Sequence, residues 1–318
     1  MECNRRRSGL PECDNGSIAP YLPSLSNTMI ASNDNDTVAL PAPLTTVLVQ
    51  RHQNGAAAPS EDDQVAAEVP VALVFNGISH AVMMCTPQDL SELALGFALS
   101  EGIIDRREDC HDLEIAPVDT CADPLREPDL PAVEVRLEIA PRAFMRLKER
   151  RRSLAGRTGC GVCGIDSLQA LDLVPERLAP PAWLAQIGPE QLFKAMAGLP
   201  AGQTLNQATG AVHAAGYADA TGELIAVYED VGRHNALDKL LGARALASSG
   251  PDRAPWPSDG FVVMSSRASY ELVRKCARLS VPLLATISAP TSLAIRVAES
   301  GGVQLWGLVR EPRAIRYA

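Results

Sequence analysis

The chain has 318 residues, 46% of them hydrophobic and 21% charged, which is enough for one large or two medium-sized domains and excludes disorder throughout. Its 29 basic and 38 acidic residues give a net charge of −9, which argues against non-specific nucleic-acid binding. The sequence has no run of about 18 apolar residues, and no apolar segment follows the early arginines, so we expect neither a membrane span nor a secretory signal. Eight unevenly placed cysteines are too few for a disulfide scaffold and favour a reducing cytoplasm.

The first ordered segment predicts paired strands. Apolar runs at residues 45–49 and 70–75 are typical of strands, and the polar stretch 50–63 between them predicts a surface loop. The Asn76-Gly77 pair follows directly and is the usual signal for a hairpin turn.

A helix is predicted next, with Thr86 as its N-cap and Pro87 at its first position. Gly102 is expected to stop it. The residues that recur at helical spacing and predict its buried face are Leu90, Leu93, Ala94 and Phe97.

Two more segments complete this part of the chain. Residues 110–131 are polar and contain prolines, which predicts a loop, whereas residues 132–139 alternate apolar and polar side chains like a half-buried strand. Residues 142–157 hold seven basic side chains and one acid. They are either the exposed end of a helix or a segment that docks a partner or tunes the cysteines that come after it.

The last hundred residues alternate apolar strands with amphipathic helices. This pattern predicts a parallel or mostly parallel sheet that is covered by helices on both faces. The predicted strands are residues 224–228, 261–264, 283–287 and 303–309.

The turns after these strands are expected to meet at one edge of the sheet, where ligands of such folds bind. Hydroxyl groups and backbone amides at helix starts can cap the helices or bind a phosphate, and arginines strengthen the second interpretation. The residues with this chemistry are Arg233, Ser265, Ser266, Arg267, Ser288 and Thr291.

The first of these turns is rich in charge. Glu229 and Asp230 come directly after an apolar strand and are candidates to accept hydrogen bonds from a base or a ribose. Asp238 and Lys239 fit a solvated helix with local ion pairs. His234 is a weak candidate by itself, because single histidines are more often structural than functional.

The most specific motif is Cys160-Gly-Val-Cys163, which lies among glycines and after the arginine-rich segment that would favour the thiolate form. A thioredoxin-like redox pair would need a helix start here. A zinc or iron–sulfur site would need a second ligand pair, and Cys110 and Cys121 are too far apart to form one. A persulfide carrier is the favoured interpretation, and a silent pair also stays open.

Several long motifs, in order, resemble the FdhD family of formate dehydrogenase accessory sulfurtransferases. The likeness covers roughly residues 45–317 and omits the amino-terminal segment. The matching stretches are residues 86–104, 158–164, 229–239, 265–271 and 288–294.

The resemblance implies a function. Such proteins accept sulfur from a cysteine desulfurase as a persulfide. They pass the sulfur to a molybdenum or tungsten bis-guanine-dinucleotide cofactor before this cofactor enters formate dehydrogenase. For this chain, the resemblance implies Mo-bis(molybdopterin guanine dinucleotide) as a bound substrate. It implies a cytoplasmic homodimer with no permanently bound metal and no nucleic-acid or membrane partner. Cys160 would carry the sulfur with Cys163 as its partner. The implied cofactor-binding stretch is Leu308, Val309, Arg310, Glu311, Pro312 and Arg313.

Three other functions compete with sulfur transfer. Deamination needs an H-x-E pair and a P-C-x-x-C pair for zinc, but His213 is followed by two alanines and Gly159 precedes Cys160, so we reject it. A cofactor-binding chaperone without sulfur transfer and a CxxC thiol–disulfide oxidoreductase stay open.

The predicted fold class is α/β, with a mostly parallel sheet in the carboxyl-terminal part joined to a smaller amino-terminal α+β subdomain; the family resemblance implies that the carboxyl-terminal part has a cytidine-deaminase-like three-layer core. The predicted divisions are a disordered tail at 1–40, the α+β subdomain at 41–155, a mobile CxxC loop at 156–170 and the deaminase-like cofactor-binding domain at 171–318.

Overall fold

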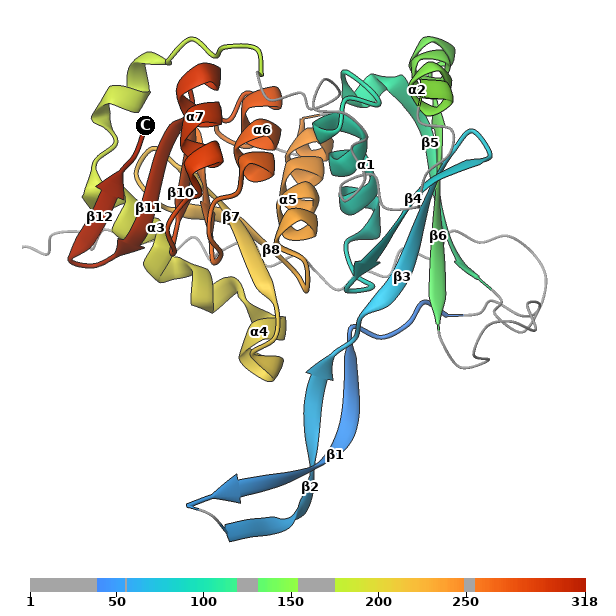
Figure 1. Ribbon diagram of the computed structural model, residues 1–318, viewed down its shortest axis with the longest axis vertical. Helices are drawn as coiled ribbons and strands as arrows, with labels where there is room; N and C mark the ends of the chain where they lie inside the picture. Colours follow the sequence, from blue (N-terminus) through green and yellow to red (C-terminus); the bar gives the residue numbers. More distant parts are fainter. Residues whose placement is uncertain (1–38, 55, 119–130, 154–174, 249–254) are drawn as a thin grey trace, which may run out of the picture.

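The computed structural model describes residues 39–54, 56–118, 131–153, 175–248 and 255–318 (Figure 1). The predicted CxxC loop and nearly all of the predicted tail lie outside these residues. Within them, no helix combines the length and the apolar composition needed to cross a membrane.

A two-stranded hairpin stands away from the body of the protein (Figure 1). Strands β1 (Leu44–Gln53) and β2 (Ala56–Ala66) pair in antiparallel fashion. The predicted loop at 50–63 is therefore wrong, because most of it belongs to these two strands. Much of this ribbon faces solvent, so its sequence lacks the alternation that marks a half-buried strand.

The amino-terminal unit is built on a four-stranded sheet in the order β4-β3-β6-β5. The Asn76-Gly77 turn is confirmed between β3 and β4, with φ values of 45° and 74°. Cys110 begins the edge strand β5, where the sequence predicted a loop. The strand was not recognised because its outward-facing residues are polar. The strands are β3 (Val69–Phe75), β4 (Ile78–Cys85), β5 (Cys110–Val118) and β6 (Ala132–Ile139), and a 3-10 turn (Arg107–Asp109) precedes β5.

Helix α1 (Leu90–Ser100) packs between this sheet and the rest of the protein, and helix α2 (Pro141–Ser153) follows β6. The four predicted residues of the buried face of α1 are confirmed as buried. Thr86 is not the N-cap, since Asp89 holds that position with φ 53°. Gly102, with φ 68°, follows the end of the helix as predicted.

The carboxyl-terminal unit contains a six-stranded sheet in the order β12-β11-β10-β9-β7-β8. Strands β9, β10 and β11 are parallel, and β8 runs in the same direction because β7 is antiparallel to both β8 and β9. Four of the six strands run in one direction, but only two of the five neighbouring pairs are parallel, because β7 and β12 run antiparallel to their neighbours; the sheet is therefore mixed, and the prediction of a mostly parallel sheet holds for β9, β10 and β11 alone. The strands are β7 (His213–Asp219), β8 (Leu224–Asp230), β9 (Gly260–Met264), β10 (Leu283–Thr286), β11 (Gln304–Arg310) and β12 (Arg313–Arg316).

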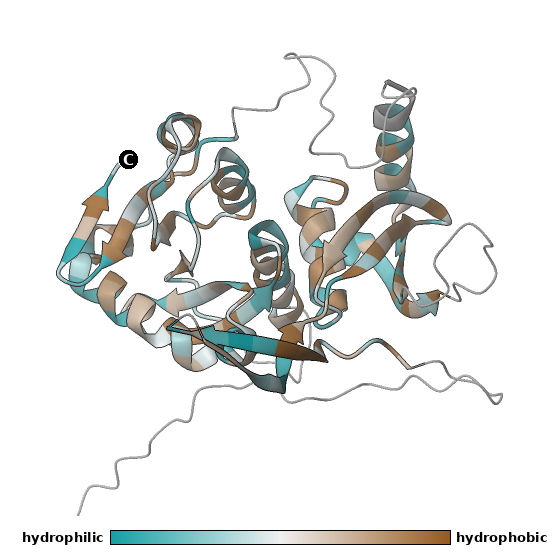
Figure 2. Cartoon of the chain, turned by 60° about the horizontal axis from the view of Figure 1, so that its bottom comes forward, coloured by the Kyte–Doolittle hydropathy of each residue, from teal (hydrophilic) through white to brown (hydrophobic). Residues whose placement is uncertain are grey.

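Helices cover both faces of this sheet. Figure 2 shows hydrophobic residues along the strands of the four-stranded and the six-stranded sheet. One apolar cluster joins the sheet to α5, α6 and α7, and a second joins the opposite face to α3 and a 3-10 turn. These layers confirm a mixed α/β fold; the finer likeness to cytidine deaminases stays a prediction. The helices are α3 (Pro189–Gly202), α4 (Thr204–Thr209), α5 (Arg233–Ala247), α6 (Tyr270–Arg278) and α7 (Ser292–Gly301), and the 3-10 turn is Ala182–Gln186.

The two units meet where α1 packs against α5. A Cβ atom on Gly96 would overlap the carbonyl group of Asp238, and one on Gly242 would overlap the carbonyl group of Glu92. Only glycine permits backbones to approach this closely, so the contact fixes the spacing of the two helices.

Candidate functional site

Four turns lie at the carboxyl ends of the co-directional strands. They follow β8, β9, β10 and β11, and because these strands run the same way, the turns occupy one edge of the sheet. The predicted gathering of the turns is therefore confirmed. This edge is where α/β sheets bind ligands.

Two arginines give this edge its charge. Arg233 starts α5, and Arg267 is exposed in the turn after β9. Burial lowers the pKa of Arg233, and the nearby positive charge of Arg267 lowers it further. Its Nε atom is buried and has no hydrogen-bond partner in the described part of the chain. The carboxylate of Glu271 offsets part of this lowering, but two guanidinium groups with an unused donor still leave positive charge for an anionic ligand.

A histidine–glutamate pair lies beside these arginines. His234 Nε2 is 2.7 Å from Glu271 Oε2 and 3.2 Å from Ser269 Oγ. Burial would raise the pKa of Glu271, but the contact with His234 outweighs it and lowers the value. The imidazole of His234 thus pairs with Glu271. The sequence did not reveal this pairing, because His234 was considered there without a partner.

His213 is brought to the same edge by the pairing of β7 with β8, where it lies opposite Asp230. Burial lowers its pKa, and the charges of Arg233 and His234 lower it further, which favours the neutral imidazole. The edge therefore combines a neutral histidine with two arginines.

The serines of the β9–α6 turn serve the fold. Ser265 Oγ accepts a hydrogen bond from the amide of Ala214 at 2.7 Å. Ser266 is buried, and its hydroxyl donates to the carbonyl of Arg267 at 3.0 Å. Both bonds hold the turn in shape, which leaves the Arg267 side chain as its exposed charged group.

The next two turns touch each other. Thr291 caps α7 by accepting a bond from the amide of Ala294 at 3.3 Å, so helix capping accounts for its hydroxyl. Ser288 is exposed, and its carbonyl accepts from the amide of Leu308 at 3.3 Å. Leu308 has φ 54°, at the start of the tight connection into β12.

The stretch implied by family resemblance divides in two. Val309 is completely buried, and its side chain packs in the core beneath α3. Arg310, Glu311, Pro312 and Arg313 are exposed at the β11–β12 turn. They place two further positive charges at the same edge.

Asp230 does not face a ligand. Its side chain is fully buried; Oδ1 accepts from the Gly232 amide and from Asn235, while Oδ2 accepts from Thr86 and pairs with Lys239 at 2.7 Å. The expected contact with a base is therefore wrong, because the carboxylate is occupied within the protein. Strand β8 thus ends in a buried structural carboxylate.

Glu229 is also engaged internally. Its Oε2 accepts from the amide of Leu205 at 2.8 Å and its Oε1 from the amide of Asn206 at 2.9 Å, at the start of α4. It is 3% exposed. The proposed base contact is wrong for this carboxylate as well.

The expected solvated ion pairs on α5 are buried instead. Lys239 is fully buried against Asp230, and Asp238 is 1% exposed. Asp238 pairs with Lys275 at 2.9 Å, and Ser100 from α1 donates to it at 2.7 Å. Helical spacing alone does not reveal that α1 covers this side of α5.

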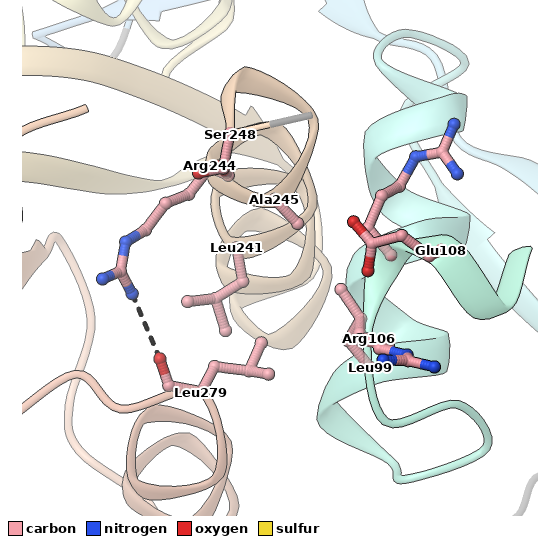
Figure 3. Close-up of a pocket in the computed structure, with 9 residues that line it drawn as sticks. Leu99, Arg106, Glu108, Leu241, Arg244, Ala245, Ser248 and Leu279 are labelled. Carbon is pink, nitrogen blue, oxygen red and sulfur yellow. Dashed lines mark hydrogen bonds between the residues drawn. The ribbon is translucent and has the colours of Figure 1, made fainter. Parts of the chain in front are cut away.

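A cavity of about 310 Å³ lies elsewhere, between the carboxyl-terminal half of α5 and the turn that precedes β5 (Figure 3). Arg244 lines it, but its Nη1 donates to the carbonyl of Leu279 at 3.1 Å and its guanidinium lies over the ring of Tyr217. Because Arg233 is at the opposite end of α5, this cavity is separate from the charged edge.

The predicted sulfur site is not among the described residues, since Cys160 and Cys163 fall in 154–174. The described cysteines, Cys85, Cys110 and Cys276, are all buried. The described residues include no group of three or more histidine, cysteine or acidic side chains that could hold a metal ion. The described part of the basic segment, residues 142–153, belongs to α2, where Arg142 pairs with Asp109 at 2.9 Å.

The fold and its charged edge define a mixed α/β protein suited to an anionic ligand. A model of the FdhD/NarQ family matches residues 66–318, and the chain belongs to this family.

Similar proteins agree with this assignment. A sulfur carrier protein FdhD of Chromobacterium violaceum is 56% identical over 274 residues, which are 86% of this chain and 95% of that protein. A sulfur carrier protein FdhD of Burkholderia mallei is 52% identical over 270 residues, 85% of this chain and 94% of that protein.

A crystal structure from Desulfotalea psychrophila, described as that of a candidate formate dehydrogenase accessory protein, matches with a TM-score of 0.61. The match covers 86% of this chain and 96% of that one at 21% identity, and it supports the fold alone.

Proposed function

We propose that this protein is a sulfur carrier for the maturation of formate dehydrogenase. The observation that carries the proposal is the pair Arg233 and Arg267 at the sheet edge, in a chain whose relatives are named sulfur carrier proteins. An unused buried guanidinium donor beside a second arginine suits a phosphate-bearing substrate.

The sulfur step is assigned to Cys160. Its thiolate attacks the terminal sulfur of a persulfide on a cysteine desulfurase; the sulfur–sulfur bond of the donor breaks, and the desulfurase cysteine leaves as a thiolate. Cys160 then carries the persulfide, with Cys163 as its neighbour in the same motif. The basic residues that precede the motif favour the reactive thiolate.

The proposed acceptor is the molybdenum or tungsten bis-guanine-dinucleotide cofactor, bound as substrate before it enters formate dehydrogenase. Its phosphates would meet Arg233 and Arg267, and the exposed Arg310 and Arg313 would add charge beside them. We further propose that the core has the cytidine deaminase architecture and that the protein acts as a homodimer in the cytoplasm.

Intact mass spectrometry after incubation with a cysteine desulfurase tests the proposal. The wild type should gain about 32 mass units per sulfur atom, Cys160→Ala should gain none on this motif, and Cys163→Ala serves as the matched control. Cys160→Ala should also abolish formate dehydrogenase activity while the protein stays folded.

Other outcomes would identify the competing functions. Guanine nucleotide binding with no sulfur adduct would indicate a cofactor-binding chaperone. Turnover of protein disulfides, with the two cysteines cycling between dithiol and disulfide, would indicate an oxidoreductase.

A further inference from the structure

The turn that carries Arg233 is held by a residue from the other unit of the protein. Thr86 precedes α1, is completely buried, and contacts Asp230 directly before this turn. We propose that Thr86, Asp230 and Lys239 form a positioning cluster that sets Arg233 and His234 for anion binding. This inference rests on the proposed function of the edge.

Asp230 divides its two oxygens between two tasks. Oδ1 accepts from the amide of Gly232 at 2.8 Å and from Nδ2 of Asn235 at 3.0 Å, which ties down the first turn of α5. Oδ2 accepts from the amide of Thr86 at 3.1 Å and from its hydroxyl at 3.0 Å. One carboxylate thus joins the turn to the amino-terminal unit.

Lys239 completes the cluster from the next turn of α5. Its Nζ lies 2.7 Å from Asp230 Oδ2 and donates to the Thr86 hydroxyl at 2.7 Å and to the Glu229 carbonyl at 3.1 Å. The cluster is fully buried, so its charges are strongly coupled and costly to separate.

The turn itself has little capacity to hold its shape without these bonds. Gly232 is the N-cap of α5 and has no side chain to cap it. Arg233 is the first residue of the helix and His234 the second. A shift of Asp230 therefore moves both side chains relative to Arg267, which stands on a different turn.

A second cluster at the same helix junction provides a matched control. Ser100 Oγ lies 2.7 Å from Asp238 Oδ1 and 2.8 Å from Nζ of Lys275, so its hydroxyl also joins an aspartate to a lysine across α1 and α5. This second cluster includes Lys275 of α6 and does not contact the turn at residues 230–233. Removing its hydroxyl weakens the junction without loosening Arg233.

The test compares Thr86→Val with Ser100→Ala by calorimetric titration with GDP. Thr86→Val should weaken GDP binding by about tenfold, because small displacements of charged groups are expensive in affinity. Ser100→Ala should leave affinity within about twofold at a comparable loss of thermal stability. Thr86→Ser, which keeps the hydroxyl, should restore binding.

A measurement on the wild type needs no variant. Coupling is reciprocal, so GDP should slow hydrogen exchange in peptides that contain Thr86, although this residue is fully buried and does not itself face the ligand. Wild-type affinity in Thr86→Val, equal weakening in both variants, or unchanged exchange at Thr86 would each overturn the inference. A wild type that fails to bind GDP would instead overturn the proposed cofactor site at this edge, on which the inference rests.

Discussion

Replacement of Arg267 by glutamine should change ligand binding and stability in opposite directions. In the free protein, the charge of Arg267 lowers the pKa of Arg233, which means that the two cations repel each other. Arg267 is exposed, so solvent screens this repulsion, and its removal should stabilise the free protein by a few tenths of a kcal/mol. That corresponds to a rise in Tm of about 1 °C or less.

Binding should suffer far more. A hydrogen bond from an arginine to a phosphate contributes about 1.5–3 kcal/mol, so the variant should bind GDP between about tenfold and about a hundredfold more weakly. The affinity of the wild type should also fall as salt is added, and the variant should show a smaller fall.

The assay is titration with GDP together with thermal unfolding in buffer without phosphate. Arg296→Gln is the control, because it removes one exposed charge from α7 and leaves the edge intact. Unchanged GDP affinity in Arg267→Gln, or an equal loss in Arg296→Gln, would refute the assignment of the edge as an anion site.

Two more predictions concern the junction of the units. Gly242→Ala should destabilise the protein by about 2 kcal/mol in urea unfolding, because the added Cβ would overlap the backbone carbonyl of Glu92. Gly198→Ala in α3 should be nearly neutral, because its Cβ would meet only the end of the Leu224 side chain, which can shift. Equal effects of the two substitutions would contradict this reasoning. Burial raises the pKa of Glu101, but Lys275 and Arg274 reverse this and hold it at about 2, below its ordinary value of 4.5. The Glu101 carboxylate therefore stabilises the fold above about pH 4.5, and this stabilisation is lost as the pH falls toward 2. Glu101→Gln should lower the free energy of unfolding by on the order of 3 kcal/mol at neutral pH and by little at pH 2. A difference in unfolding free energy between wild type and variant that stays constant across this pH range would exclude the mechanism.

The sequence predicted the layered core well because burial leaves a strong pattern there. The strand at 261–264 is a continuous apolar run, the strand at 283–287 is apolar apart from Thr286, and the turns after them were placed correctly at one edge. The helix that contains Leu90, Leu93 and Phe97 was recognised for the same reason. Its start was misplaced because Thr86 looks like an N-cap and is bonded elsewhere.

The errors share a cause: the sequence does not say which polar groups are paired at long range. Asp230 is 144 residues from Thr86, and Asp238 is 138 residues from Ser100, so no local pattern could show that these carboxylates are buried. An acid directly after an apolar strand was therefore assigned to a ligand. The β1–β2 hairpin was missed because exposed strands carry no alternation of apolar residues.

The glycine contact between α1 and α5 has a consequence for the architecture. Removal of either unit would expose the charged groups at this contact. Asp238 and Lys275, for example, would lose their contacts with Ser100 and Glu101. We therefore expect neither half to fold by itself, because each would expose charged groups that the other half now covers.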